Sequence, residues 1–118
     1  MEITVRELQD YLFHNYGQRA QEQGLFMKLV EEIGEVAEVL NRRSGRKDAG
    51  EGDLQGQLAN ELADVIHYAA AIAAINGIDL SDTILEKDRQ ASIKYHHDIN
   101  LETFVAARRA ALKDGADA

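Results

Sequence analysis

Two pairs of acidic residues are spaced so that four carboxylates could share one site. Glu32 and Glu35 are three residues apart, and so are Glu61 and Asp64. On a helix, this spacing puts both members of a pair on one face, one turn apart. Both pairs stand among apolar residues, where negative charge without a partner is costly. Oxygen ligands of this kind suit a hard divalent cation, so the pattern predicts a site for Mg²⁺ or Mn²⁺.

Two amphipathic helices are expected to carry these acids. Residues 25–43 carry apolar side chains at helical spacing, and residues 54–75 do so after Asp53, a good N-cap. The second of these helices is expected to end before Asn76, at a pair of residues typical of helix C-termini. The polar, glycine-rich segment between the helices, residues 44–53, is the one evident loop.

Three more helices complete a compact four- to five-helix bundle. A capping box at Thr4 and Glu7 opens the first, and Asp79 and Asn100 can cap the last two. Their expected positions are residues 5–19, 80–95 and 101–112, the last followed by a frayed tail at residues 113–118. The sequence therefore predicts an all-α fold in a single domain over residues 1–118, built on a central antiparallel helix hairpin.

The two acidic pairs are expected at the same height in this hairpin. Glu35 lies nine residues before Ser44 and Glu61 eight residues after Asp53, so at ~1.5 Å per residue both stand roughly 12–14 Å from the loop. At ~100° per residue, Glu32 and Glu61 lie on matching flanks of apolar stripes that we expect to face each other. A single pair in a chain with 21 acidic residues is usually a solvated helix face, but two matched pairs favour one cluster.

Composition narrows the class of protein and its surroundings. The 118 residues include no cysteine, which excludes disulfides and thiolate zinc sites and fits a reducing cytoplasm. No signal peptide is evident, and the longest apolar run, residues 69–75, is too short to span a bilayer. The net charge of -8 argues against nucleic acid as a partner. We therefore expect a cytoplasmic protein that binds neither a membrane nor a nucleic acid polymer.

The second half of the predicted third helix indicates an oligomer. Residues 69–75 are apolar on every side of that helix, and a helix of this kind must be buried all round. Because four short helices can hardly bury it alone, we expect a homodimer or a tetramer built from dimers, with the alanines of this stretch near the interface.

The acidic motifs resemble those of a known family. Residues 28–38 (KLVEEIGEVAE), followed by residues 61–66 (ELADVI), are similar to the ExxE…ExxD signature of the MazG family, which belongs to the all-α nucleotide pyrophosphohydrolases. Twenty-five residues separate Glu35 from Glu61, an ordinary interval for the signature. The resemblance covers residues 25–95, and it is specific for the superfamily rather than for a substrate.

The resemblance implies an activity and a set of ligands. MazG-like enzymes use Mg²⁺ to hydrolyse nucleoside triphosphates to a monophosphate and pyrophosphate, and they assemble as dimers or as tetramers of dimers. The resemblance implies that four acidic residues are the metal ligands: Glu32, Glu35, Glu61 and Asp64. A basic stretch on the following helix is matched by Lys87, Lys94 and Tyr95. Ala91 stands where many members have an asparagine, so polar contacts from that position are not expected.

Two residues beside the first acidic pair have candidate roles in cleaving a phosphoanhydride. That reaction needs neutralised phosphate charge, a positioned water and a stabilised leaving group. Glu31 directly precedes a predicted ligand and is a candidate general base; the alternative is an exposed acid four residues from Glu35. Lys28 lies one turn before Glu32 and could reach phosphate or only offset the carboxylates.

The predicted fourth helix offers further contacts to substrate. Lys87 and Lys94 could neutralise phosphate groups or form a solvated face, and Tyr95 could stack on a base or pack at an interface. On the third helix, His67 is more simply interpreted as an interior histidine than as a metal ligand.

The favoured function is house-cleaning hydrolysis of a (d)NTP to (d)NMP and pyrophosphate. A related alternative is phosphoribosyl-ATP pyrophosphatase, an all-α enzyme of histidine biosynthesis that uses acidic residues in the same way. An alternative of another class is a non-catalytic acidic helical module for oligomerisation. The matched acidic pairs argue against this last alternative, because a pure scaffold gains nothing from charge beside its core.

Overall fold

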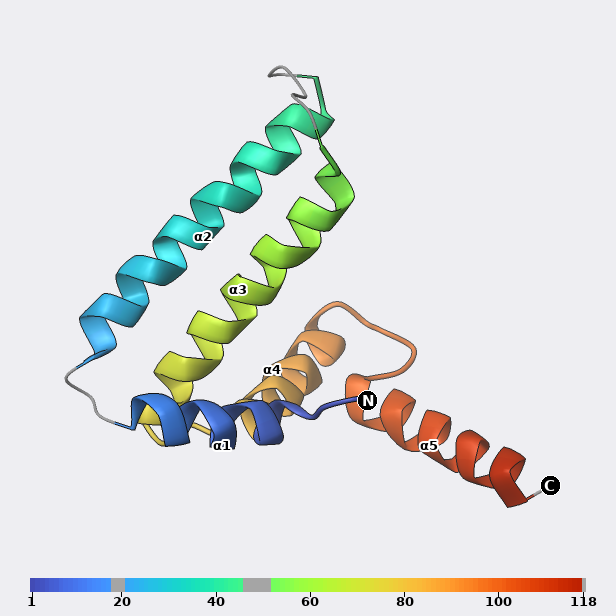
Figure 1. The fold of residues 1–118 in the computed structure, drawn as a ribbon. Helices are drawn as coiled ribbons and strands as arrows, with labels where there is room; N and C mark the ends of the chain where they lie inside the picture. The colour runs from blue at the N-terminus through green and yellow to red at the C-terminus, as the bar shows by residue number, and fades with distance from the viewer. Residues whose placement is uncertain (18–20, 46–51, 118) are drawn as a thin grey trace. The chain divides into compact units, whose positions relative to one another are not determined.

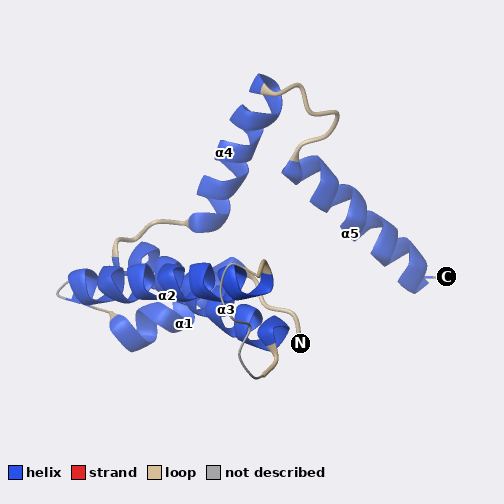
Figure 2. Ribbon diagram, turned by 90° about the horizontal axis from the view of Figure 1, so that it is seen from above, coloured by secondary structure: helices blue, strands red, loops and turns tan. Residues whose placement is uncertain are grey.

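The computed structural model describes residues 1–17, 21–45 and 52–117, and all regular structure in these residues is helical (Figures 1 and 2). The five helices are α1 (Val5–Tyr16), α2 (Glu22–Arg43), α3 (Leu54–Ile75), α4 (Leu80–Lys94) and α5 (Leu101–Asp117). They form two compact units, Met1–Ile78 and Asp79–Ala118. The predicted all-α class is confirmed.

α1 begins where the capping box predicts. The Thr4 hydroxyl oxygen accepts a hydrogen bond from the Glu7 N–H at 3.0 Å, and the Glu7 carboxylate accepts one from the Thr4 N–H at 2.8 Å. The helix ends at Tyr16 rather than at the predicted residue 19. The reason is Gly17, which adopts a left-handed conformation (φ 33°) and donates its N–H to the Phe13 carbonyl at 2.8 Å.

α2 and α3 form the predicted antiparallel hairpin and lie side by side (Figure 1). α2 begins at Glu22, three residues before the expected start, with this acid in the first turn, where the helix dipole favours negative charge. Asp53 occupies the N-cap position of α3, although its side chain makes no capping hydrogen bond. α3 ends at Ile75 as predicted, and Gly77 then takes a positive φ of 66°. Residues 46–51 of the predicted loop lie outside the described part of the chain.

α2 turns a different side toward α3 from the one expected. Its buried or half-buried apolar side chains are Leu25, Leu29, Val36 and Val39. Much of the predicted stripe stays 47–53% exposed, namely Phe26, Val30, Ile33 and Leu40. At ~100° per residue the two sets together span roughly half the circumference of α2, more than one neighbouring helix covers. The stripes of α2 and α3 therefore do not face each other, and an apolar side of the hairpin is left open.

α1 packs against the second half of α3 and completes the core of the first unit (Figure 1). Leu12 of α1 is fully buried at 0% exposure, and the Gln9 side chain donates a hydrogen bond to the Ile78 carbonyl at 2.6 Å. The buried residues of α3 are Ala70, Ala71, Ala73, Ala74 and Ile75. Four of the alanines that we expected near an oligomer interface are thus buried within the chain, where their small side chains permit close packing, whereas Ala69 is exposed.

α3 is long and apolar enough to cross a membrane by length and composition alone. It has 22 residues, and its most apolar 18-residue window has a mean hydropathy of 1.3. A charged residue such as Asp64 near the middle would cost roughly 3 kcal/mol in a bilayer, and both α1 and α2 pack on this helix. We therefore interpret α3 as a core helix. Only 28% of its apolar window is buried, which leaves apolar surface uncovered.

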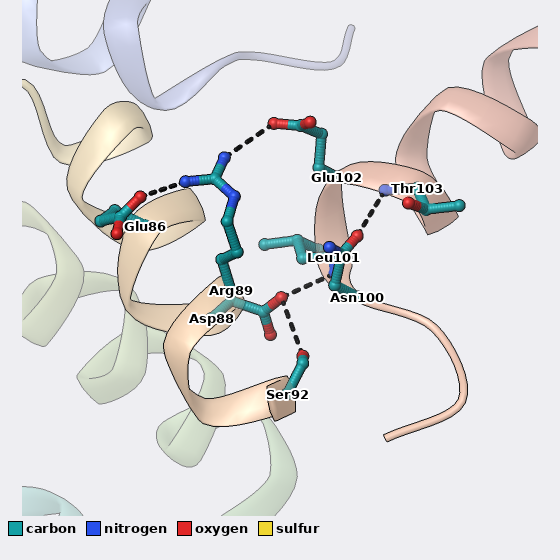
Figure 3. Close-up of polar contacts among 8 residues, drawn as sticks. All are labelled: Glu86, Asp88, Arg89, Ser92, Asn100, Leu101, Glu102 and Thr103. Atoms are coloured by element: carbon teal, nitrogen blue, oxygen red, sulfur yellow. Dashed lines mark hydrogen bonds and ion pairs between the residues drawn. The ribbon is translucent and has the colours of Figure 1, made fainter. Parts of the chain in front are cut away.

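In the second unit, polar contacts join α4 to the start of α5 (Figure 3). The Asp88 carboxylate accepts a hydrogen bond from the Leu101 N–H at 2.7 Å. The Arg89 guanidinium pairs with Glu86 on its own helix and with Glu102 on α5, the latter at 3.1 Å. These contacts hold the N-terminal turn of α5 against the second half of α4.

Both predicted N-caps form in this unit. Asp79 accepts a hydrogen bond from the Asp82 N–H at 3.1 Å, and Asn100 accepts one from the Thr103 N–H at 2.9 Å. α5 continues to Asp117 instead of ending at residue 112. Residues 106–112 are all alanine, arginine or leucine, strong helix formers that support the turn that follows them.

Candidate metal centre

Three of the four predicted ligands come together between α2 and α3. Carboxylate oxygens of Glu32 on α2 and of Glu61 and Asp64 on α3 lie within 4.8 Å of one another. The Glu32 and Glu61 side chains are half-buried, and Asp64 is exposed. In the described residues this is the one group of histidine and acidic side chains that could hold a metal ion. We call these three residues the acidic group.

The acidic group holds more negative charge than its surroundings balance. A hydrogen bond between Glu32 and Glu61, partial burial, and the charges of Glu61 and Asp64 raise the pKa of Glu32 to about 7. Two carboxylates share a hydrogen bond only when one of them carries a proton. A divalent cation would take the place of that proton, and three oxygen donors at this separation fit such an ion.

The fourth predicted ligand, Glu35, is exposed and is not part of the acidic group. It follows Glu32 by three residues, so its side chain is rotated by ~60° around α2 relative to that of Glu32. Because α3 contacts the flank of α2 that includes Glu32, this rotation carries Glu35 toward solvent. The ligand role of Glu35 stays a prediction.

Glu31 and Lys28 form an ion pair beside the acidic group. The Lys28 Nζ atom lies 3.2 Å from the Glu31 carboxylate, and both side chains are mostly exposed. The hydrogen bond from Lys28 to Glu31, together with the Glu31 charge, raises the pKa of Lys28. Lys28 thus offsets negative charge on α2, one of the two roles that the sequence left open. The general-base role of Glu31 stays a prediction.

A pocket of about 410 Å³ opens in the same unit. It is lined by Tyr16, Gln21, Gly24, Leu25, Lys28 and Tyr68. Lys28 precedes Glu32 by four residues and Tyr68 follows Asp64 by four, so in an antiparallel hairpin both lie one turn from the acidic group, on the side away from the loop. The sequence reasoning missed Tyr68, although its spacing from Asp64 was the signal that could have found it.

The residues expected to contact substrate from the fourth helix lie in the second unit. Lys87 and Lys94 are exposed on α4. The Lys94 Nζ atom lies 5.3 Å from the centre of the exposed Tyr95 ring, a cation–π distance. Arg89, by contrast, is occupied by its two glutamate partners. The substrate-binding roles of Lys87, Lys94 and Tyr95 stay predictions.

Known families offer a test of the acidic motifs. The sequence model of the MazG nucleotide pyrophosphohydrolase domain matches residues 20–92. The chain belongs to the MazG nucleotide pyrophosphohydrolase family. A solved MazG structure, that of iMazG from Vibrio DAT 722, is 33% identical with a TM-score of 0.59, and the match covers 79% of this chain and 98% of that one. A comparison with curated protein sequences gave no significant match.

The MazG match includes the whole acidic group. It extends over α2 and α3 and into α4 as far as residue 92, so the family domain takes helices from both units. α5 lies beyond the matched residues. The resemblance that the two acidic motifs indicated is therefore confirmed, and the acidic group belongs to a MazG pyrophosphohydrolase domain.

Proposed function

We propose that this MazG protein is a Mg²⁺-dependent nucleoside triphosphate pyrophosphohydrolase. It would convert a (d)NTP and water to (d)NMP and pyrophosphate and so clear unwanted nucleotides from the pool. The observation that carries the proposal is the meeting of Glu32, Glu61 and Asp64 within 4.8 Å, one turn from a pocket that holds a lysine and two tyrosines. Membership of the MazG family supports the same class of reaction.

Mg²⁺ is the ion that suits this set of donors. Glu32, Glu61 and Asp64 would hold it, with Glu35 as a further ligand at the edge of the group. Mg²⁺ prefers hard oxygen ligands and commonly combines carboxylates with substrate phosphates and water, and Mn²⁺ should substitute for it. When bound, the ion would neutralise phosphate charge and lower the pKa of a water molecule.

Glu31 is proposed to accept the proton of the attacking water. It neighbours Glu32 in the chain, and its carboxylate is exposed rather than buried in the acidic group. Lys28 now pairs with it at 3.2 Å. An exposed ion pair of this kind is weak, so an arriving phosphate can draw the lysine away. That exchange would place a cation on the phosphate and free the Glu31 carboxylate to act as a base.

The pocket indicates how the proposed nucleotide substrate would be oriented. With the phosphates at the acidic group, the nucleoside would extend one helical turn, about 5.4 Å, toward the tyrosines. The rings of Tyr16 and Tyr68 could stack on a base, an interaction that is favourable for every base. Lys87 and Lys94 are proposed to contact phosphate and Tyr95 to contact the nucleotide.

A second copy of the chain is proposed to cover the open apolar side of the hairpin. On α3, Leu62 and Ile66 are 45% and 59% exposed. Helical geometry puts them on the flank that matches the exposed stripe of α2, so in an antiparallel hairpin both stripes lie on one side, away from Asp64. A homodimer, or a tetramer built from dimers, would remove this surface from water. A cysteine-free chain of this kind fits a cytoplasmic location.

The test is a substrate panel with detection of released pyrophosphate. Purified protein with Mg²⁺ or Mn²⁺ would be offered normal and damaged nucleoside triphosphates and phosphoribosyl-ATP, with Glu61→Gln as the inactive control. Pyrophosphate from nucleoside triphosphates supports the proposal. Turnover of phosphoribosyl-ATP alone would indicate the related enzyme of histidine biosynthesis. No pyrophosphate from any of them would favour the non-catalytic module.

A further inference from the structure

His67 of α3 lies between the two tyrosines of the pocket. Its Nε2 atom is 2.9 Å from the Tyr16 hydroxyl, in a hydrogen bond that joins α1 to α3. Its ring meets both tyrosine rings edge-on, with centroids 5.8 Å from Tyr16 and 4.8 Å from Tyr68. The imidazole itself does not line the pocket. His67 therefore contacts the aromatic walls from behind rather than facing a ligand.

Tyr16 depends on this contact for its position. It is the last residue of α1, and Gly17 turns the chain away immediately after it. Helix ends fray in the absence of tertiary contacts, so the contact with α3 holds this terminal side chain in place. The Tyr16 side chain is half-buried, and this burial raises the pKa of its hydroxyl. A hydroxyl in that state needs a hydrogen-bond partner, and His67 provides it.

We propose that His67 is a positioning residue for nucleoside binding. By fixing Tyr16, it sets one wall of the pocket, and by occupying the Tyr16 hydroxyl it leaves the ring as an apolar stacking surface. The inference rests on the proposed function and deepens it, because it assigns the pocket to the nucleoside rather than to the phosphates. His67 would then act on binding of the base and not on phosphate chemistry.

The proposal separates two kinds of ligand. A nucleoside triphosphate would use both the acidic group and the pocket, whereas inorganic tripolyphosphate would use the acidic group alone. In His67→Phe, the Tyr16 hydroxyl loses its partner, and a lost hydrogen bond of this kind typically weakens an interaction about five-fold. We expect KM for a (d)NTP to rise about five-fold with little change in kcat, while the inhibition constant of tripolyphosphate stays at its wild-type value.

Two further variants distinguish positioning from general damage. His67→Gln keeps a polar nitrogen that can reach the Tyr16 hydroxyl, so KM should return most of the way to wild type. Tyr16→Phe combined with His67→Phe removes both partners and leaves apolar rings, so it should harm KM less than His67→Phe alone. The matched control is His14→Phe, which alters an exposed histidine of α1 outside the pocket.

The results can be assigned to one hypothesis or the other. Pyrophosphate release by the wild type tests the proposed function alone. If the wild type is active and His67→Phe leaves KM unchanged, or raises KM and the tripolyphosphate constant equally, the positioning role is wrong and the proposed function stands. A wild type that neither hydrolyses nor binds nucleotides overturns both. Thermal melts of each variant show whether it folds. If His67→Phe does not fold, His67→Ala, which also removes the partner of the Tyr16 hydroxyl, takes its place with the same expected and contradicting outcomes.

Discussion

Replacing Glu61 with glutamine should abolish a pH dependence of Mg²⁺ binding that Glu32 imposes. The hydrogen bond that protonated Glu32 donates to the Glu61 carboxylate is the largest of the causes that raise the pKa of Glu32 from 4.5 to about 7. Glutamine has nearly the same shape as glutamate, can donate a hydrogen bond to the Glu32 carboxylate, and adds no negative charge. In the variant, the pKa of Glu32 should therefore fall back toward 4.5.

The size of the effect follows from competition between Mg²⁺ and the Glu32 proton. With a pKa of about 7, the apparent dissociation constant should be about eleven times its limiting value at pH 6, about twice at pH 7, and close to the limit at pH 8. Wild-type affinity should thus rise about ten-fold between pH 6 and pH 8. Glu61→Gln should bind more weakly throughout, because a ligand is lost, but with almost no change over this range.

The same pKa sets the stability of the metal-free protein. Between pH 4.5 and about 7, the folded protein keeps a proton on Glu32 that the unfolded chain has released. Stability contributed by this group is therefore fully present below pH 4.5 and is lost as the pH rises toward 7. Glu61→Gln should remove this loss and melt higher than wild type at pH 7 without metal. Added Mg²⁺ should raise the wild-type melting temperature by mass action and raise that of the variant less.

Calorimetric titration with Mg²⁺ at pH 6, 7 and 8, with thermal melts at the same pH values, measures both effects. Asp10→Asn is the control, because it removes one charge from an exposed position on α1. The reasoning fails if wild-type affinity is flat between pH 6 and pH 8. It fails equally if Glu61→Gln keeps the wild-type pH dependence, since Glu61 would then not be the cause of the raised pKa.

Three further outcomes are expected. Glu31→Gln should keep near-normal Mn²⁺ binding but lose about 10²–10⁴-fold in kcat. Normal turnover would mean that Glu31 is only a solvated residue of the helix surface, and lost Mn²⁺ binding would mean that it is a metal ligand. Lys87→Ala and Lys94→Ala should mainly raise KM, because they would contact phosphate before as well as during the reaction; a selective fall in kcat would contradict this. Light scattering at micromolar concentration should show at least a dimer that Ile66→Asp dissociates, whereas a wild type at 13.1 kDa would rule the interface out.

The helix caps of this chain could be predicted from its sequence because each cap depends on residues that are close together in the chain. The capping box at Thr4 formed as predicted, as did the caps at Asp79 and Asn100. Each needs only a side chain within three residues of the helix start. The meeting of Glu32 with Glu61 was also predictable, since helical rise fixes the height of each acid in a hairpin once the loop is located.

Tertiary structure decided how the helices are rotated against one another. An apolar arc as wide as that of α2 can be covered from more than one side, so periodicity could not choose which flank meets α3. The chosen flank includes Glu32 in the acidic group and leaves Glu35 exposed. The sequence could not show where α1 packs. In the structure α1 packs on α3, where four of the alanines that had suggested an interface are buried.

The pocket shows the same division between sequence and structure. Tyr16 and His67 are 51 residues apart in the chain, and only the packing of α1 on α3 brings them within 2.9 Å. The sequence determined which carboxylates could bind a metal ion and how far along the hairpin each one lies, because residue spacing and helical rise are set within a single helix. Which of these carboxylates meet, and which aromatic side chains stand beside them, depended on contacts between helices that no local pattern encodes.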